Sequence, residues 1–313
     1  MTTPFKEITS GLKFPEGPVA MPDGSVILVE IARDDDQGAY LNMVVQIETR
    51  ETLTRVTPDG KQHVIAKLGG GPNGAALGPG GKIYVTNNGG FNWIERPDGR
   101  LFPGTQPASY KGGSIQVVDP ETGKFETLYD SCDGRKLNGP NDLVFDDAGG
   151  FWFTDLGKTR EYDNDRGAVY YAKADGSKIE QKVFPLERPN GCGLSPDGKT
   201  LYVVETPTAR LWAFDLSAPG TIKDANGAYR GEKGRVVAGL GGYQMFDSLA
   251  VDSAGHVCVA TLITGAVSDI SPDGQSVTQY KLPDPMVTNV CFGGPDLRTA
   301  YATRWNPVNA RAE

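Results

Sequence analysis

Cysteine is scarce in this chain of 313 residues, and its few thiols stand far apart. The sequence has four of them, none in a C-x-x-C pair: Cys132, Cys192, Cys258 and Cys291. This spacing predicts neither a zinc knuckle nor a dense disulfide framework. We therefore expect reduced thiols that behave mostly as small core residues.

Long apolar runs and an excess of basic charge are also missing. No window approaches the roughly 18 unbroken apolar residues of a membrane span, and the N-terminal residues contain no apolar core of a secretory signal. The 31 basic residues are outnumbered by 39 acidic ones, for a net charge of −8, so no basic field attracts a phosphate backbone. These absences argue against membrane and nucleic-acid partners and predict a cytoplasmic protein.

Helical periodicity is hard to find, whereas turn residues are plentiful. The chain contains 41 glycines and 22 prolines. Between them, short β-branched and aromatic runs alternate with turn signals, the pattern of an all-β fold. No long Gly/Ser or charged linker divides the chain, so we expect one domain over residues 1–313.

A strand, a glycine turn and a second strand recur six times. Each copy has an oxygen-bearing side chain near its start, here called an anchor: Glu16, Asn73, Asn141, Asn190, Asp247 and Asn289. A glycine follows eight residues later in five copies, and Leu297 replaces it in the sixth. Successive anchors are separated by 42 to 68 residues, a repeat length of several strands that is typical of propeller blades.

Further strand pairs lie between the copies and supply outer hairpins for five of them. Together with the sixth inner hairpin, they predict a six-bladed β-propeller. The N-terminal segment "PFKEITSGL" (4–12) is placed to add an outer strand to the last blade. Such closure would remove an exposed sheet edge.

In this propeller the anchors begin the innermost strands and point into the central channel at one face. The second strands return to that face and bring Glu30, Asn87, Asn88, Asp155 and Glu205 near the anchors. The loops that follow, residues 87–112 and 155–167, are long enough to form the walls or lid of a pocket.

Four anchors, Glu16, Asn141, Asn190 and Asp247, offer two carboxylates and two amide oxygens. Hard oxygen ligands suit Ca²⁺, Mg²⁺ or Mn²⁺, and two carboxylates neutralise one divalent ion. Each Asn or Asp taken singly also fits an ordinary turn cap. The recurrence favours one metal site, Ca²⁺ before the other ions. Three roles remain open for Asn73 and Asn289. They could contact the substrate, hydrogen-bond to the metal ligands, or simply be turn residues.

Two competing motifs fail on context. "GGGPNG" (69–74) fits a dinucleotide-binding glycine pattern, but it leads into a strand and not a helix. A Ser-His-Asp triad is not expected, because the chain has no G-x-S-x-G motif. Its two histidines, His63 in an outer hairpin and His256 just after the Gly255 turn, are remote from the anchors.

With these residues in place, the sequence resembles the SMP-30/gluconolactonase/LRE family, also called regucalcin-like. The resemblance covers nearly the whole chain and rests on four segments in order: "FPEGP" (14–18), "NGPNDLVFDDAGGFWFTD" (138–155), "RPNGCGLSPDGKTLYVVET" (188–206) and "FDSLAVDSAGHVCVAT" (246–261). It implies a six-bladed propeller with one divalent cation, Zn²⁺ included among the possible metals. The family's ligands fall on Glu16, Asn141, Asn190 and Asp247.

The resemblance also implies hydrolysis of a small-molecule lactone, commonly a sugar lactone, with Asp247 as the general base. We expect Asn73, Asn88, Asp155 and Asn289 to contact the substrate. Animal members carry an arginine two residues before Asn141, where this chain has Gly139, so their sugar contacts do not transfer. Two other functions remain open: a phosphotriesterase-like hydrolase and a binding propeller with a structural ion.

Overall fold

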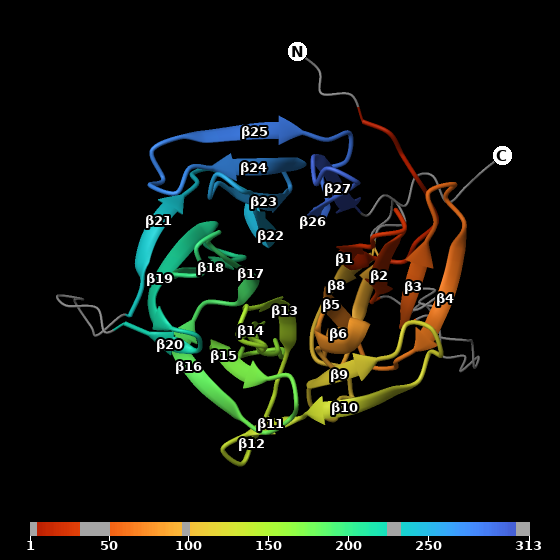
Figure 1. The fold of residues 1–313 in the computed structure, drawn as a ribbon. Coiled ribbons are helices and arrows are strands. Elements are labelled where there is room, and N and C mark those ends of the chain that lie inside the picture. Colours follow the sequence, from red (N-terminus) through yellow and green to blue (C-terminus); the bar gives the residue numbers. More distant parts are fainter. Residues whose placement is uncertain (1–4, 32–50, 96–100, 224–232, 305–313) are drawn as a thin grey trace.

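The computed structural model describes residues 5–31, 51–95, 101–223 and 233–304, nearly all of them in strands and tight turns. The fold is an all-β propeller, as the sequence predicts. The described residues form five sheets of four or more strands and a sixth sheet of two strands. All sheet pairing is antiparallel, and the five large sheets follow each other around a central axis (Figure 1).

In each blade the first strand lies nearest the axis and the others follow outward (Figure 1). The first blade contains β1 (Pro15–Ala20), β2 (Val26–Glu30), β3 (Thr52–Val56) and β4 (Gln62–Lys67). The second contains β5 (Pro72–Leu77), β6 (Ile83–Asn87), β9 (Ser114–Val118) and β10 (Phe125–Tyr129). The third contains β13 (Pro140–Phe145), β14 (Gly150–Asp155), β15 (Gly167–Lys173) and β16 (Ile179–Leu186).

The fourth blade contains β17 (Pro189–Leu194), β18 (Thr200–Glu205) and β19 (Arg210–Ala218), with β20 (Thr221–Ile222) and β21 (Arg235–Gly239) both paired to β19. The fifth contains β22 (Met245–Val251), β23 (Val257–Leu262), β24 (Ala266–Ile270) and β25 (Val277–Lys281). The last sheet is the hairpin of β26 (Val287–Gly293) and β27 (Thr299–Arg304). Two small hairpins complete the list: β7 (Trp93–Glu95) with β8 (Leu101–Pro103), and β11 (Ser131–Cys132) with β12 (Arg135–Lys136). One 3₁₀ turn, η1, spans Pro79–Gly81.

The innermost strands close a ring around the axis. Strand β1 contacts β5, and the contacts continue through β13, β17 and β22 to β26, which returns to β1. The Thr288 Oγ1 hydroxyl of β26 donates to the Pro15 carbonyl of β1 at 2.9 Å, which joins residues 273 positions apart. The two ends of the described chain are therefore neighbours in the ring (Figure 1).

The prediction of a six-bladed propeller is wrong for the described residues, which contain five complete blades and the two-stranded β26–β27 sheet. Residues 5–14 contain no strand. The segment has polar contacts with two blades, because Gln62 of β4 donates to Thr9 and Ser10, while Glu7 pairs with Arg304 of β27. It forms no strand ladder with either of them, so it adds no outer strand to the last sheet.

The glycine turns have the geometry that the repeat predicts. Gly24, Gly149, Gly198 and Gly255 all have positive φ, between 66° and 87°, a conformation that a Cβ disfavours. In the sixth copy Leu297 adopts φ 56°, although it is not a glycine. Gly81 of the second copy has φ 71°, so all six copies have a positive φ at this position of the turn, including the copy whose sequence departs.

The apolar core lies between neighbouring blades. On β14, Phe151 and Phe153 pack in a cluster with Tyr84 and Ile115 of the second blade, whereas Trp152 packs with Leu201 of the fourth. Successive side chains of a strand point to opposite faces, and both faces of this strand are covered. This explains the continuous apolar run "FWF" in place of an alternating pattern.

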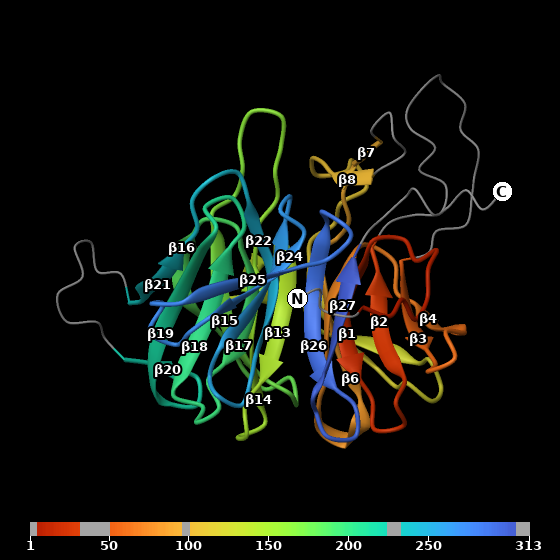
Figure 2. The same ribbon diagram turned by 90° about the horizontal axis from the view of Figure 1, so that it is seen from above.

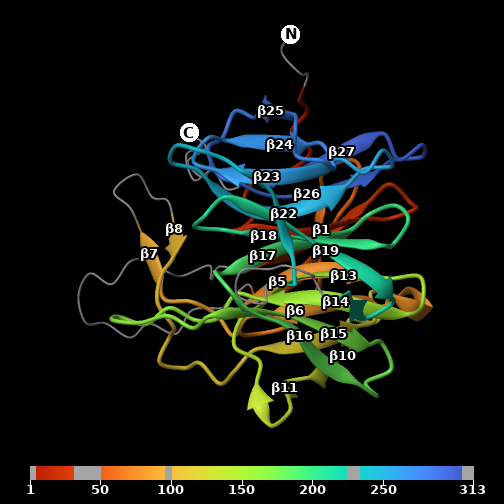
Figure 3. The ribbon, with the colours of Figure 1, turned by 90° about the vertical axis from the view of Figure 1, so that its left-hand side faces the viewer.

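The second strand of each inner hairpin ends at the same face as the anchors. Pro72 pairs with Asn87, and Pro140 with Asp155, so the loops that follow β6 and β14 leave from that face. Figures 2 and 3 show the β7–β8 hairpin and the β14–β15 connection rising on this side of the molecule. Within the described residues, no helix has the length and apolar character that crossing a bilayer requires.

Candidate active site at one end of the propeller axis

A β-bulge follows the start of each of the six innermost strands. In β13, Pro140 pairs with Asp155 and the next pair is Leu143 with Phe153, so two residues on one side, Asn141 and Asp142, oppose only Thr154 on the other. The same one-residue excess occurs in the five other inner strands. Bulges re-aim side chains, and here the anchor and its successor are both buried at the bulge.

Threonine hydroxyls connect these bulges to the next blade. Thr154 Oγ1 accepts the Asp142 N–H at 3.1 Å and donates to the Asn190 carbonyl of the fourth blade. Thr86 makes the equivalent pair of bonds, from the Gly74 N–H and to the Asn141 carbonyl. The anchors Asn141 and Asn190 are thus fixed at their backbone by the preceding blade.

Glu16 and Asp247 are the two acidic anchors, and both are almost fully buried. Burial raises the pKa of each carboxyl well above its usual range, and repulsion from Asp247 raises the pKa of Glu16 further. Glu16 Oε2 accepts a 3.0 Å bond from Asn289 Nδ2, and hydrogen bonding with Asn190 lowers the pKa of Asp247 in part. The two carboxyls lie close enough to repel, so a bound cation would stabilise their ionised forms.

Asn141 and Asn73 meet between the second and third blades. Asn141 Nδ2 donates to Asn73 Oδ1 at 3.4 Å, and Asn88 Nδ2 donates to the same oxygen at 2.8 Å. The other end of the Asn141 amide, Oδ1, is buried and has no hydrogen-bond partner among the described residues. A buried acceptor without a donor is costly, so this oxygen is available for a ligand.

Asn190 faces Asp247 from the fourth blade. Its Nδ2 donates to Thr206 Oγ1 at 3.0 Å, and its Oδ1 accepts a long 3.5 Å bond from Ser248. The Arg188 guanidinium is near enough to lower the pKa of Asp247. All four predicted ligands therefore lie at the anchor face of the axis.

The residues predicted to contact the substrate lie at the same end of the propeller axis, and each has different hydrogen-bond partners. Asp155 accepts three backbone N–H bonds, from Asn138, Gly139 and Gly157, which order the start of the 155–167 loop. Asn73 and Asn88 bond to each other, and Asn289 bonds to Glu16. Their contact with a substrate stays a prediction.

Asp142 and Lys158 are among the buried charged residues that the sequence did not point to. Asp142 follows the anchor Asn141, and burial raises its pKa to about 7. Lys158 is 1% exposed and reaches from the 155–167 loop into the 87–112 loop. Asp142 could have been found by assuming a bulge after each anchor, whereas nothing in the sequence marks Lys158 as a buried lysine.

The donor set fits a divalent ion such as Ca²⁺. It combines two buried carboxyls that repel each other with an amide oxygen that lacks a donor. Within the part of the chain that the structure describes, no three His, Cys, Asp or Glu side chains gather as a metal site. The candidate set instead relies on two carboxylates and two amides, which are ligands that Ca²⁺ accepts.

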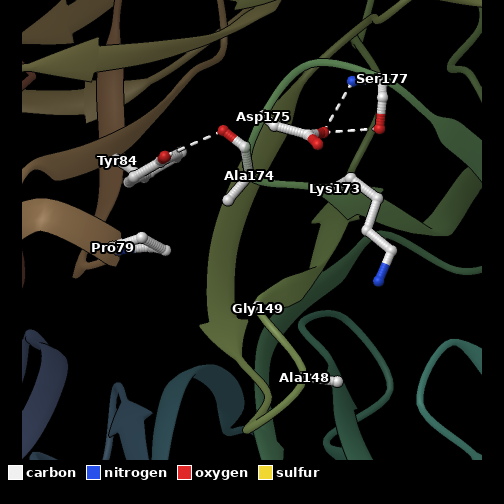
Figure 4. Close-up of a pocket in the computed structure, with 8 residues that line it drawn as sticks. All are labelled: Pro79, Tyr84, Ala148, Gly149, Lys173, Ala174, Asp175 and Ser177. Atoms are coloured by element: carbon white, nitrogen blue, oxygen red, sulfur yellow. Dashed lines mark hydrogen bonds between the residues drawn. The ribbon is translucent and has the colours of Figure 1, made fainter.

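Two hollows on the surface of the described residues contain none of the four predicted metal ligands, although the second includes Asp155. One, of about 440 Å³, lies at the opposite face among the turns, lined by Pro79, Tyr84, Gly149, Lys173 and Asp175, with others (Figure 4). Its acidic group is already engaged, because Asp175 accepts bonds from the backbone and hydroxyl of Ser177. The other, of about 350 Å³, is lined by Arg135, Asp155, Arg166 and Phe184, among others, beside the third blade.

Comparison with known proteins identifies the class. Residues 14–306 match the SMP-30/Gluconolactonase/LRE-like region, so the chain belongs to this family of propeller proteins. The gluconolactonase of Zymomonas mobilis is 26% identical over 336 residues, which cover all of this chain and 82% of the relative. The 6-deoxy-6-sulfogluconolactonase of Pseudomonas putida is 32% identical over 193 residues, covering 60% of this chain and 62% of that protein.

Solved structures agree on the fold. A gluconolactonase from Xanthomonas campestris superposes with a TM-score of 0.68 at 22% identity, covering 94% of this chain and 84% of that one. A calcium-binding regucalcin from Agrobacterium tumefaciens gives a TM-score of 0.66 at 22% identity, covering 92% and 81%. The family and its fold are therefore established, and named relatives support lactone hydrolysis at the level of the family.

Proposed function

We propose that the protein is a metal-dependent hydrolase that opens a sugar lactone to its hydroxy acid. The observation that carries the proposal is the unpartnered, buried Oδ1 of Asn141, in a site that also holds two buried carboxyls. Glu16, Asn141, Asn190 and Asp247 would hold one divalent ion, Ca²⁺ first among the choices. A divalent ion held there would polarise the lactone carbonyl.

Asp247 acts in this proposal as the general base. Its carboxylate takes a proton from the attacking water as the new C–O bond forms at the carbonyl carbon. The ring C–O bond then breaks, and the leaving alkoxide takes up that proton from Asp247. The products are a hydroxyl group and a carboxylic acid, which releases its own proton to solvent and becomes a carboxylate. Burial of Asp247 favours proton uptake, and Arg188 nearby stabilises the ionised form.

Substrate contacts are assigned to Asn73, Asn88, Asp155 and Asn289, which lie around the predicted ion site. The same oxygen ligands suit a phosphotriester, and a structural ion would suit a binding propeller. The whole chain is taken as one domain, and its cytoplasmic location stays a prediction.

The test is a pH-stat assay of full-length, chelator-treated protein on a panel of aldonolactones and phosphotriesters, with Ca²⁺, Mg²⁺, Mn²⁺ or Zn²⁺ restored. We expect ion-dependent lactone opening, with Asp247→Ala lowering kcat/KM about 10²- to 10⁴-fold, the range of general-base catalysis. Glu16→Gln should weaken activation by the ion. The control is Glu126→Gln, which neutralises an exposed carboxylate on outer strand β10 and should leave activity unchanged.

Each rival has its own outcome. If no lactone is opened with any of the four ions, the lactonase proposal is wrong. Turnover of phosphotriesters alone would support the second function. An ion-dependent rise in Tm without any turnover would support the binding propeller.

A further inference from the structure

Lys158 is a buried lysine in the loop after β14, and its contacts lie in a different loop. Its Nζ donates to the Gly90 carbonyl at 2.7 Å and to Asn88 Oδ1 at 3.3 Å. The ammonium also lies 4.2 Å from the centroid of the Phe91 ring. Lysine is almost never fully buried without partners, and these contacts are the partners that Lys158 has in the interior.

Asn88 is the first amide that Lys158 contacts. Its Oδ1 also accepts the Gly90 N–H at 2.8 Å. Both neighbours are donors, and only the oxygen end of an amide accepts a hydrogen bond. The Asn88 amide is therefore held with its Nδ2 toward Asn73, to which it donates at 2.8 Å.

The orientation of the Asn73 amide in turn determines that of the Asn141 amide. Asn73 must present Oδ1 toward Asn88, and the same oxygen accepts the bond from Asn141 Nδ2 at 3.4 Å. Because the Asn141 amide uses its nitrogen for this bond, its oxygen is left at the other end, buried and without a partner among the described residues. The orientation of three amides is thus determined by donors at Lys158 and Gly90.

We propose that Lys158 is a positioning residue that turns the oxygen of Asn141 toward the predicted metal ion, acting through Asn88 and Asn73. The inference rests on one part of the proposed function, the presence of a bound ion, and does not depend on which reaction the protein catalyses. With Asn88 reversed, Asn73 would turn its Nδ2 toward Asn141. The Asn141 oxygen would then accept that bond, and its N–H groups would face the cation site.

The relay works in either protonation state of the lysine. Burial lowers the pKa of Lys158 to about 7. A neutral amine keeps two N–H donors, enough for Asn88 and Gly90. Removal of the side chain, and not its titration, is therefore the informative change.

The experiment measures binding of Ca²⁺ alone to chelator-treated, full-length protein by isothermal titration calorimetry. Lys158→Met keeps the length of the side chain but has no donor. We expect it to raise the Kd for Ca²⁺ about 10- to 100-fold, the usual effect of losing a group behind a metal ligand. Lys136→Met is the matched control, because Lys136 also donates to a loop carbonyl, that of Lys111, but has no bond to the asparagine relay.

A second variant separates the relay from a role in folding. Asn88→Asp keeps the acceptor for Lys158 and Gly90, and it adds an ion pair, so the fold should be retained. An ionised carboxylate at position 88 cannot donate a hydrogen bond to Asn73 Oδ1. To keep a hydrogen bond with this carboxylate, Asn73 must donate from Nδ2, which requires its amide to reverse. The Kd for Ca²⁺ should rise at least tenfold, although a negative charge has been added near the site.

Four outcomes decide the matter. Weaker Ca²⁺ binding in both variants, with Lys136→Met unchanged, supports the relay whether or not any lactone is hydrolysed. A wild-type Kd in Lys158→Met overturns it. Wild-type or tighter binding in Asn88→Asp shows that amide orientation is not transmitted, which also overturns it. If the unmodified protein binds no Ca²⁺, the metal site and the relay fail together.

Discussion

At the scale of single residues, function depends on which polar groups lack partners. Six anchors share a position in the repeat, but their contacts differ: Asn289 bonds to Glu16, Asn73 to Asn88, and Asn190 to Thr206. Only the oxygen of Asn141 is buried without a hydrogen bond among the anchors of the described chain. The sequence pointed to all six anchors and predicted four of them as metal ligands. It could not show which amide oxygen lacks a donor, because a repeat position does not reveal the neighbours of a side chain.

A prediction at this scale concerns His256, which lies at the face opposite the anchors. Its Nδ1 is 2.6 Å from Asp269 Oδ1, and this hydrogen bond raises the pKa of the imidazole above its usual value of about 6.5. A raised pKa stabilises the fold fully below the unfolded-state pKa, and the contribution is lost as the pH rises through the folded-state pKa. The wild type should therefore have a higher Tm than His256→Asn near pH 5.5, and this difference should shrink by pH 9.

Thermal unfolding followed by circular dichroism at several pH values checks the prediction. Asp269→Asn removes the partner and should show the same pH dependence. A Tm difference that stays constant between pH 5.5 and pH 9 would contradict the assignment. The side chains are 35% and 23% exposed, so the effect is reduced by solvent screening and should be small.

At the scale of elements, the bulged inner strand is the unit that builds the site. The sequence predicted the hairpins and their glycine turns, since both depend on local signals. It did not predict the bulges, because strand register depends on a partner strand and cannot be judged from one strand alone. The bulge also explains why Asn141 and Asp142 are buried together.

Thr154 tests the connection between a bulge and the next blade. Thr154→Val removes the acceptor for the Asp142 N–H and the donor to the Asn190 carbonyl, both in a buried setting. We expect a loss of about 1–3 kcal/mol in the free energy of unfolding, the cost of buried polar groups left unpaired. Thr154→Ser retains the hydroxyl and should lose less. Urea unfolding measures both, and equal losses would mean that the methyl group, and not the hydroxyl, matters.

At the scale of the whole molecule, the ring of inner strands brings both ends of the chain to one site. Glu16 is in the first of these strands and Asn289 in the last, and their side chains meet at 3.0 Å. The sequence predicted the propeller and the face at which the anchors gather. It was wrong about a six-bladed propeller, because a short N-terminal segment with a suitable position in the chain was taken for a strand. Residues 5–14 contain no strand and touch β4 and β27 through isolated polar contacts.

Ring closure leads to the last prediction. A chain ending at residue 284 lacks β26 and β27, and it would expose the sides of β1 and β22 that β26 covers. We expect this variant to lose near-ultraviolet circular dichroism and to aggregate on gel filtration. Thr288→Val, which loses the bond to Pro15, should keep the fold with a loss of about 1–3 kcal/mol. A monomeric, cooperatively unfolding truncated protein would show that five blades close without the hairpin.

The sequence by itself determined the all-β class, the repeat and the oxygen-bearing anchors, because turns and strand alternation are local properties of the chain. Only the tertiary structure decided which amide oxygen is left for a ligand, which lysine is buried behind it and how many blades are complete. These features depend on contacts between residues about 70 to 270 positions apart, such as Lys158 with Asn88 and Thr288 with Pro15. Such contacts exist only after the blades have packed around a common axis.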